Sequence, residues 1–364
     1  MRDEFEKKLE EKLKSQNLIK RKRIIQECGT LIKAMLLYIN DNLSYQRLSD
    51  IMALNYGAAM SDTAWKKQIL KATPFFFKAA QELVNEAFTK ATDDKNSTIL
   101  NKYHCYALDA TNVPIEGISS DVIRVHTQYS LNHQCCKYAL ITDSHTAEST
   151  TNFKIEKDSI YTADRAYGRS RQLVHILDNY ADFIVRFSPS HIVFYADSQC
   201  KTKINIHEKL SDTNFFTQIC YIKYKSKIFQ VKIIAKKKPL DKQQKSEKKA
   251  RRKAQKNQNQ LSQKTIDFSK WLFIVTSITD DDLTEDVLTF YRLRWDIELF
   301  FKRTKSLFNF HKVRHSYSKH RDHVVYLWFA VAFMICAFKF ELIYYLYCDI
   351  SEFNLFSLTK YLFS

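Results

Sequence analysis

A change in hydrophobic periodicity near residue 102 constrains the fold of this chain more than any other feature. Before it, apolar residues recur at helical spacing, as in IIQECGTLIKAMLLYI, and predict helices over residues 1–95. After it, the runs YHCYALDAT, DVIRVHTQYSL and CKYALITDS alternate as strands do. A strand, a helix and a strand follow in DSIYTADRAYG, SRQLVHILDNY and ADFIVRFS. This order of elements is typical of a mixed α/β sheet.

Two short helices are predicted inside the N-terminal region, joined near residues 55–57. Ser44 and Ser61 stand where N-caps would, because their hydroxyls can accept a hydrogen bond from the first helical turn. A helix-turn-helix with residues 62–70 as its second helix would give this pattern. Any small helical bundle would give it as well, so both interpretations stay open.

Residues 191–275 indicate a β-rich insertion, with strands in IVFYAD, TQICYIKYKSKIFQVKIIAKK and KWLFIVTSI. A basic segment, residues 236–264, interrupts it with twelve Lys or Arg, two acids and no aromatic residue. Its charge of twelve minus two, or +10, makes up most of the net charge of +17. Such a segment cannot build a core, which predicts a solvated loop or a frayed helix. An arm that contacts phosphates and gains affinity by counterion release is the other, compatible interpretation.

The net charge of +17 predicts a polyanionic partner, either nucleic acid or an anionic membrane. The apolar run over residues 324–338 is shorter than the roughly 20 residues of a membrane span, so we expect a buried C-terminal helix and no membrane partner.

Only four Gly occur, which excludes a Gly-rich nucleotide-binding loop. The eight Cys form no CxxC pair and no signal peptide precedes the helices, so a cytoplasmic protein without zinc is expected.

Residues 284–308 are predicted to form one helix, because they lack Pro and Gly and Thr284 can cap the start. At 100° per residue, one stripe about 80° wide carries Tyr291, Arg294, Glu298, Lys302 and Lys305. The opposite side should pack into the core and carries Leu293, Ile297, Phe300, Thr304 and Phe308. An amphipathic helix with ion pairs explains the stripe as well as a site for phosphate and metal does.

Asp109 and Asp164 shift this balance, because each is predicted to end a strand, in LDAT and ADRAYG. With Glu298 they supply three carboxylates, the hard oxygen ligands that Mg²⁺ prefers. Two such ions about 4 Å apart can stabilise the attacking and leaving oxygens of a phosphoryl transfer. One acid at a strand end is common, but the three together favour a metal-dependent phosphoryl-transfer site.

These residues resemble the motifs of the DDE transposases of bacterial insertion sequences, in the branch called family four. The family's Y-(2)-R-(3)-E-(6)-K signature is matched by Tyr291, Arg294, Glu298 and Lys305. Asp109 in LDAT resembles the first Asp motif, and Asp164 in ADRAYG resembles the second, with Ala166 in place of the usual Gly. The resemblance runs from about residue 100 to about residue 315.

The resemblance implies a ribonuclease H-like catalytic core with Asp109, Asp164 and Glu298 as the catalytic ligands of two Mg²⁺ ions, for which Mn²⁺ can substitute. It implies that the stripe contacts DNA phosphates through Tyr291, Arg294 and Lys305, and we place Lys302 with them. The activity implied is that of a DNA transposase, which cuts transposon ends and transfers strands into target DNA. The partners implied are double-stranded DNA and a second copy of the chain, with residues 322–360 as the expected dimer contact. The setting implied is a bacterial nucleoid.

The expected organisation has five parts along the chain. A helical DNA-binding region covers residues 1–95, and the first part of the catalytic core covers 100–190. The β-rich insertion, 191–275, holds a basic loop at 236–264. A catalytic-core helix covers 276–320, and a helical C-terminal region covers 321–364.

Several alternatives accompany this interpretation. The chain could be a catalytically inactive, sequence-specific DNA-binding relative, or a basic protein associated with membranes. Tyr291 could be a nucleophile, as in tyrosine recombinases, but the constellation of Arg and His residues that accompanies such a Tyr is missing. His311 and His315 could pair on a metal, but no acid accompanies them. Trp271 and Phe273 could stack on a flipped base, although core packing is favoured.

Overall fold

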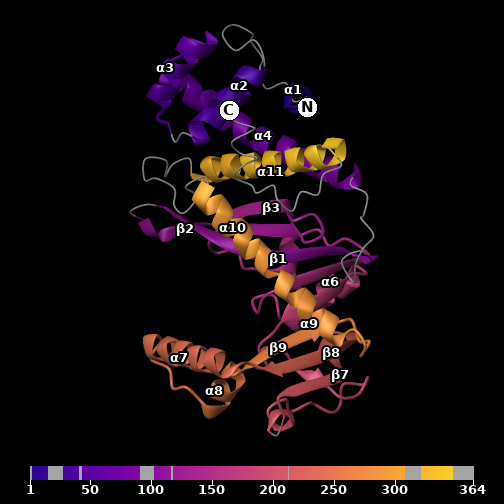
Figure 1. The fold of residues 1–364 in the computed structure, drawn as a ribbon. Helices are drawn as coiled ribbons and strands as arrows, with labels where there is room; N and C mark the ends of the chain where they lie inside the picture. The colour runs from indigo at the N-terminus through magenta and orange to yellow at the C-terminus, as the bar shows by residue number, and fades with distance from the viewer. Residues whose placement is uncertain are drawn as a thin grey trace.

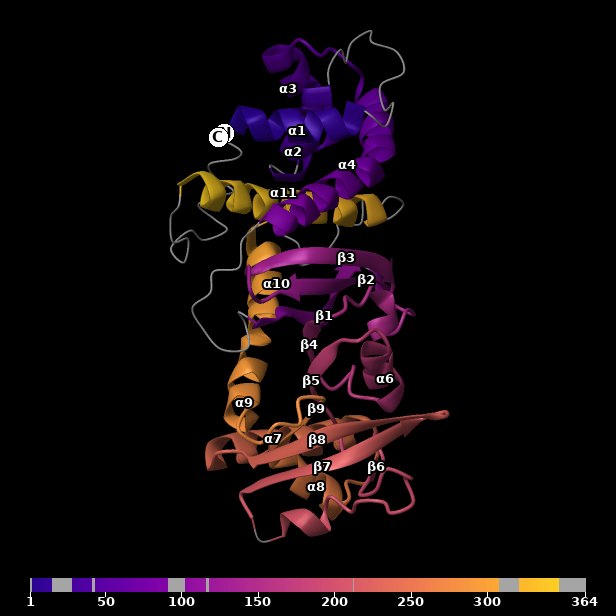
Figure 2. The ribbon, with the colours of Figure 1, turned by 90° about the vertical axis from the view of Figure 1, so that its right-hand side faces the viewer.

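The computed structural model describes residues 2–14, 28–40, 43–90, 102–115, 118–211, 213–307 and 321–346. They form a helical region, a central sheet and an extension of that sheet, stacked along one long axis (Figures 1 and 2). The first helices are α1 (Arg2–Lys14), α2 (Cys28–Asn40), α3 (Tyr45–Tyr56) and α4 (Asp62–Lys90). The later helices are α6 (Ser170–Asp178), α7 (Leu240–Lys256), α8 (Gln263–Ser269), α9 (Thr284–Leu293), α10 (Trp295–Leu307) and α11 (Arg321–Leu346).

Nine strands and two short 3₁₀ helices complete the described fold. The strands of the core are β1 (His104–Ile115), β2 (Ile118–Ser130), β3 (Cys135–Asp143), β4 (Ser159–Ala163) and β5 (Asp182–Arg186). Those of the extension are β6 (Phe194–Tyr195), β7 (Phe215–Tyr224), β8 (Lys227–Lys237) and β9 (Trp271–Thr276). The 3₁₀ helices are η1 (Thr150–Asn152) and η2 (Glu208–Leu210).

Core and extension together form one nine-stranded sheet, with the strand order β3-β2-β1-β4-β5-β9-β8-β7-β6. β1 pairs antiparallel with β2, and β2 with β3, whereas β1, β4 and β5 run parallel. The parallel strands β4 and β5 are joined through α6, which packs on β5 and on the extension (Figure 2). The predicted mixed α/β sheet is thereby confirmed, and this strand order is consistent with the expected ribonuclease H-like core.

The β-rich insertion does not form a separate sheet. β9 pairs antiparallel with both β5 and β8, so the insertion extends the core sheet at its β5 edge. The strand predicted in IVFYAD is reduced to the two residues of β6. The basic segment 236–264, predicted as a loop or frayed helix, instead contains α7, whose 17 residues form a complete helix. The loop assignment was wrong, because Lys, Arg, Gln, Glu and Ala are strong helix formers whatever their net charge.

Side chains from the two faces of β1 pack into two separate cores, because successive side chains of a strand point to opposite faces. Cys105 and Ala107 belong to the cluster that includes buried residues of α4, α10 and α11. Tyr106 and Leu108 belong to the cluster that includes α6 and the extension. Side chains from β1 therefore pack into a core on each face of the sheet.

The N-terminal helices follow the expected caps. The hydroxyls of Ser44 and Ser61 accept backbone N–H groups three residues on, at 3.2 and 3.3 Å, so both predicted N-caps are confirmed. Gly57 ends α3 with φ +62, a left-handed conformation that Gly adopts without steric cost. Residues 62–70, predicted as a short second helix, are only the start of α4, which is 29 residues long.

Helix α11 packs against α4 and β3, and its residues 324–337 are almost all buried by the rest of the chain (Figure 2). The prediction of a buried C-terminal helix is confirmed. Within the described residues, no helix is long and apolar enough to cross a membrane. Residues 324–337 of the expected dimer contact, which was residues 322–360, are thus packed against the chain itself. Residues 347–360 lie outside the described part.

Candidate active site

The segment that carries Glu298 folds as two helices, α9 and α10, and not as the single helix predicted. The break falls at Arg294, whose N–H bonds Tyr291 O at 3.2 Å while its own carbonyl accepts from Ile297 N at 3.4 Å. These i to i+3 bonds tighten the chain locally, as in a 3₁₀ turn. The predicted inner face is confirmed in its described part, because Ile297, Phe300 and Thr304 are buried and Leu293 is half-buried against the same core.

The start of α9 is held by a buried lysine and not by the predicted N-cap. Thr284 is the first helical residue, and its hydroxyl accepts a bond of 2.5 Å from Lys232 Nζ of β8. The same ammonium donates to Asp280 O at 3.0 Å and pairs with Asp281 Oδ1 at 2.7 Å. Three acceptors satisfy the three donors of an amine that is only 1% exposed, as burial requires. The extension thus fixes where α9 begins.

Asp109 and Asp164 are brought together by the register of two parallel strands. β1 and β4 pair up to Leu108 and Ala163, so each acid is the next residue of its chain at the same level. Asp164 follows the last residue of β4, as predicted. Asp109 does not end its strand, because β1 continues to Ile115 along β2. That prediction was wrong, and Asp109 lies where β1 outlasts its parallel neighbour.

Each of these carboxylates also bonds its own backbone. Asp109 Oδ1 accepts from Ala110 N at 2.8 Å, and Asp164 Oδ1 accepts from Ala166 N at 2.8 Å. These bonds fix one oxygen of each acid and leave the other oxygen for a ligand. The mild departure at Ala166 leaves this turn intact, because the bond uses only its backbone.

Burial raises the pKa of Asp109 from 3.8 to about 7. The N–H of Ala110 opposes this shift, whereas the negative charge of Asp164 adds to it. Arg294 lowers the pKa and Glu148 raises it, both by smaller amounts. The carboxyl is therefore half-protonated near neutral pH, which is typical of a site built to hold a counter-cation.

Arg294 stands between the two groups of acids. Its NH2 donates to Glu298 Oε1 at 2.6 Å, and its NH1 lies 4.0 Å from Asp109 Oδ2. The guanidinium also lies 5.7 Å from the centre of the Tyr291 ring, within range of a cation–π interaction. Its Nε is buried and makes no hydrogen bond to any described residue. Arg294 thus offers positive charge and an unused donor at the centre of the site.

The remaining residues of the predicted stripe divide into two kinds. Lys305 Nζ donates to Thr111 Oγ1 of β1 at 2.6 Å, and burial lowers its pKa while Asp109 raises it. Tyr291 is buried, and this burial raises the pKa of its hydroxyl. Lys302 is exposed on α10. The structure therefore brings Tyr291 and Lys305 to the acids and leaves Lys302 on the surface beside them.

Glu148 is a further acid that the sequence analysis missed. It precedes η1, and Gln172 Nε2 donates both to its carbonyl at 3.4 Å and to Ala166 O at 3.2 Å, which ties its loop to the turn after Asp164. Burial and then the charge of Asp164 raise its pKa. No pattern in the surrounding HTAEST stretch marks it, so only the fold could find it.

Tyr167 is buried beside the same acids. Its hydroxyl has no hydrogen-bond partner among the described residues. Burial and then the charges of Glu148, Asp109 and Asp164 raise its pKa well above the usual value. The orphan hydroxyl and the crowded carboxylates both indicate a site completed by a bound group.

The donor chemistry of this site fits a divalent cation, because carboxylate oxygens are its preferred ligands. In its present form the site is not preassembled. Among the described residues, no three His, Cys, Asp or Glu side chains are placed to hold a metal ion together. Arg294 donates to Glu298 Oε1 at 2.6 Å, so one oxygen of this carboxylate already bonds a cation of the chain itself.

The structure describes one of two further pairs of sequence candidates. Trp271 and Phe273 are 6% and 4% exposed and belong to the core cluster of the extension, so the favoured assignment to core packing is confirmed. His311 and His315 lie outside the described residues.

Comparisons with known proteins place these residues in context. The family model described as "Transposase DDE domain" matches residues 101–335. Transposase InsL for insertion sequence element IS186A, from Escherichia coli (strain K12), is 26% identical over 306 residues, which cover 81% of this chain and 80% of that protein. The transposase for insertion sequence element IS421, from Escherichia coli, is 27% identical over 307 residues, with the same coverage of 81% and 80%.

A similarity also extends to a solved structure. The piggyBac transposase, in a cryo-EM structure of its synaptic complex with hairpin DNA, aligns with a TM-score of 0.49 and 8% identity. The alignment covers 92% of this chain and 70% of that chain.

Proposed function

This chain belongs to the family of transposase DDE domains, and from that premise we propose that it cuts DNA at the ends of a bacterial insertion sequence and joins those ends to target DNA. The observation that carries the proposal is the juxtaposition of Asp109 and Asp164 on neighbouring parallel strands, facing Arg294 and Glu298. Acids on two strands and one helix, with cations between them, suit phosphoryl transfer to and from a polyanion.

Members of this family depend on a divalent metal, and the donor set of the site fits one. We propose Asp109, Asp164 and Glu298 as the ligands of two Mg²⁺ ions, for which Mn²⁺ can substitute. When bound, the ions would supply charge stabilisation for the attacking and leaving oxygens of the phosphodiester. The raised pKa of Asp109 supports this assignment, because a cation would replace the proton that the buried carboxyl holds near pH 7.

The cations of the stripe would bind the DNA. Arg294 carries a buried, unused Nε, and Lys305 has its ammonium on Thr111, two residues from Asp109. Both can therefore donate to the oxygens of a phosphate that reaches the acids. The Tyr291 ring would hold the Arg294 guanidinium in place through the cation–π contact, and Lys302 would contact a phosphate at the surface of α10.

The reaction needs no covalent bond to the protein. Water attacks a phosphodiester at the transposon end, the bond from phosphorus to the 3′ oxygen breaks, and a free 3′-OH remains. This 3′-OH then attacks a phosphodiester of the target and displaces another 3′ oxygen. The residues of the chain bind and orient the phosphates, which contributes through positioning and preorganised charge.

Two ends must be cut and joined together, so we propose that the chain acts as a homodimer on paired double-stranded ends. The helical region of residues 1–95 is proposed to bind DNA, and the place of action is proposed to be the nucleoid in the bacterial cytoplasm. The net charge of +17 supports a DNA partner.

The test is Mg²⁺-dependent cleavage of a duplex that carries the native flanking DNA, with the wild type compared with Glu298→Gln. We expect cleavage at one fixed position, and a loss of at least roughly 100-fold in the variant with duplex binding retained. Binding without cleavage by the wild type, in Mg²⁺ or Mn²⁺, would show an inactive DNA-binding relative. Equal cleavage by both proteins would exclude the role of Glu298.

A further inference from the structure

Helix α7 is mounted on the extension by one face only. Its half-buried side chains lie within about 100° of one another around the helix axis. These are Gln243, Ser246, Glu247, Ala250 and Ala254. None of the 17 residues of α7 is buried, so the helix is held against the molecule without entering a core.

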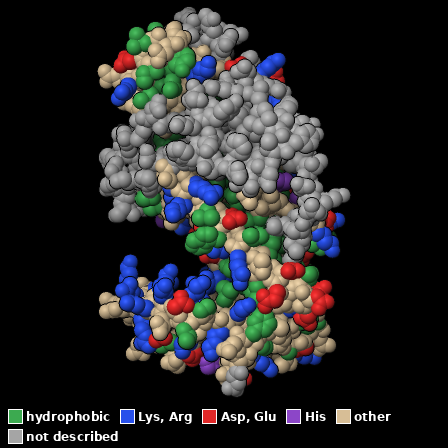
Figure 3. Space-filling view, in the orientation of Figure 1, with side chains coloured by type: hydrophobic (Ala, Val, Ile, Leu, Met, Phe, Trp, Pro, Cys, Tyr) green, Lys and Arg blue, Asp and Glu red, His purple; other side chains and the backbone are tan. Residues whose placement is uncertain are grey.

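The other face of α7 is a stripe of exposed cations, which we call the α7 stripe. It spans about 100° of the helix surface and about 21 Å of its length, at 1.5 Å per residue. Its members are Lys242, Lys245, Lys249, Arg252, Lys253 and Lys256, all exposed. Figure 3 shows Lys and Arg side chains along this edge, bordering an open notch between α7 and the rest of the molecule.

This charge is not balanced within the helix. Glu247 pairs with Arg251 at 2.8 Å, on the side away from the stripe, and Asp241 stands in the first turn. Like charges three and four residues apart repel one another and destabilise an isolated helix. A solvated surface needs only scattered charges, whereas an aligned row of cations matches a polyanion of regular spacing.

The root of α7 is anchored firmly enough to fix the direction of the stripe. Lys238 Nζ donates to Ser269 O at 2.7 Å and to Ser246 Oγ at 3.0 Å, and Gln243 Nε2 donates back to Lys238 O at 2.6 Å. These bonds join the first turns of α7 to the end of α8.

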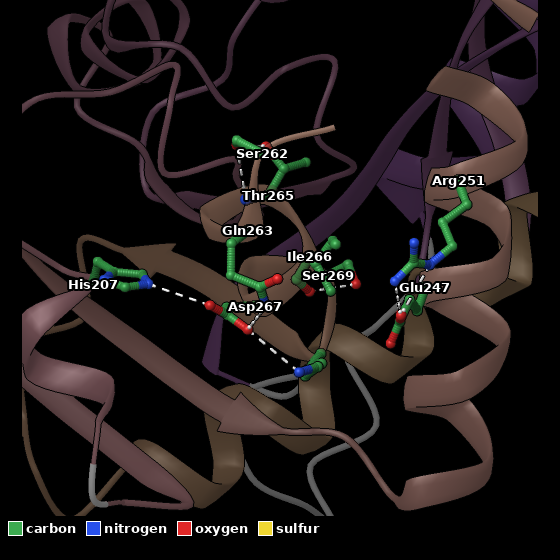
Figure 4. Close-up of polar contacts among 10 residues, drawn as sticks. His207, Glu247, Arg251, Ser262, Gln263, Thr265, Ile266, Asp267 and Ser269 are labelled. Carbon is green, nitrogen blue, oxygen red and sulfur yellow. Dashed lines mark hydrogen bonds and ion pairs between the residues drawn. The ribbon is translucent and has the colours of Figure 1, made fainter. Parts of the chain in front are cut away.

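Helix α8 is itself fastened to the extension (Figure 4). Asp267 accepts from Gln263 at 3.0 Å and from Lys270 at 3.3 Å, and it lies 3.5 Å from His207 Nε2 in the loop before η2. The Phe268 ring packs edge-on against Phe273 of β9. Hydrogen bonds and ring packing at its root thus fix the hairpin of α7 and α8 to the extension.

We propose that the α7 stripe is a docking track for the sugar-phosphate backbone of the duplex DNA next to the cleaved phosphodiester. This inference rests on the proposed function and adds to it a surface far from the acids. A length of about 21 Å matches roughly six base pairs of duplex. Contacts to phosphates carry no sequence information, so the track holds any duplex equally and sets its direction.

The test is the salt dependence of duplex binding by full-length protein. Lys245, Lys249 and Arg252 are replaced together by Ala, and fluorescence anisotropy is measured between low and high KCl. We expect the slope of log Kobs against log[KCl] to become shallower by about 2 to 3, because each lost phosphate contact removes about 0.9. The loss should be the same for the native end and for a scrambled duplex.

The matched control replaces Lys201, Lys203 and Lys223, which are equally exposed but lie beside the outer strand β6, and changes the net charge by the same amount. Its slope should change by less than about 1. Equal slopes for the two triple variants would overturn the track. Metal-dependent cleavage at low salt separates this failure from a failure of the proposed function, because the wild type would then still cut its DNA and Glu298→Gln would not.

Discussion

Replacing Asp109 with Asn should stabilise the metal-free protein at alkaline pH and not at acidic pH. The Asp109 side chain is 18% exposed, and burial raises its pKa from 3.8 to about 7. A carboxyl whose pKa is higher in the folded than in the unfolded chain contributes stability below the unfolded pKa and loses it as pH rises through the folded pKa. The loss therefore accumulates between about pH 4 and pH 7 and is complete at pH 8.

The magnitude follows from the size of the shift. Each unit of pKa corresponds to about 1.36 kcal/mol, so the wild type should lose about 2 to 3 kcal/mol of unfolding free energy between pH 5 and pH 8 through this group. At about 2.1 cal/mol/K per residue of unfolding entropy, that is about 3 to 4 °C in the melting temperature of a chain of 364 residues. Asn has no charge to bury, so the variant should lack this decline.

The assay is thermal unfolding in EDTA at pH 5 and pH 8. Asp282→Asn, at an exposed acid, serves as the control and should follow the wild type. If the melting temperatures of the wild type and of Asp109→Asn changed by the same amount between pH 5 and pH 8, the reasoning from burial would be refuted. A second measurement adds Mg²⁺ at pH 8. The ion should raise the melting temperature of the wild type more than that of Asp109→Asn, because a ligand stabilises a protein by binding its folded state and the variant lacks one proposed metal ligand.

Three further predictions follow from the same contacts. Arg294→Met should move the pH of half-maximal cleavage upward in a pH–rate profile, because Arg294 lowers the pKa of Asp109, while Arg294→Lys should move it less. Lys232→Met should reduce the unfolding free energy in urea by roughly 2 to 3 kcal/mol and weaken cleavage, because it removes the bonds that hold the start of α9. Gly168→Ala should lower both melting temperature and cleavage, because a Cβ there would lie 2.5 Å from Arg186 O and force the turn after Asp164 to move.

The sequence predicted those parts of the site that depend on local pattern. Asp164 could be placed because an apolar strand and a polar turn flank it within a few residues. The inner face of α10 could be placed because helical geometry alone fixes which residues share a side. The order of acids and the mixed sheet followed from the same patterns.

The rest depended on partners distant in the chain. Asp109 was misplaced because β1 is prolonged by its pairing with β2, which no local pattern shows. The break at Arg294 has no Pro or Gly, and it coincides with the point where the guanidinium reaches Asp109 and Glu298. Glu148 was missed because its role depends on Gln172, which ties its loop to the turn after Asp164. Helix α7 was missed for a different reason. Its composition favours a helix, but the loop was predicted from its high net charge and its lack of aromatic residues.

Under the proposed function, the position of Arg294 would couple the binding of metal to the binding of DNA. In the structure its guanidinium donates to Glu298 Oε1 at 2.6 Å and lies 4.0 Å from Asp109 Oδ2. Its positive charge therefore lies among the acids, where a metal ion would bind. A metal that takes these carboxylates frees Arg294 for a phosphate, and a phosphate that takes Arg294 frees the carboxylates for a metal. The two binding events must then be linked by one coupling free energy. DNA should therefore raise the affinity for Mg²⁺ by the same factor as Mg²⁺ raises the affinity for DNA. Arg294→Met should reduce this factor towards one, because each ligand would then meet a site that the other no longer changes through Arg294.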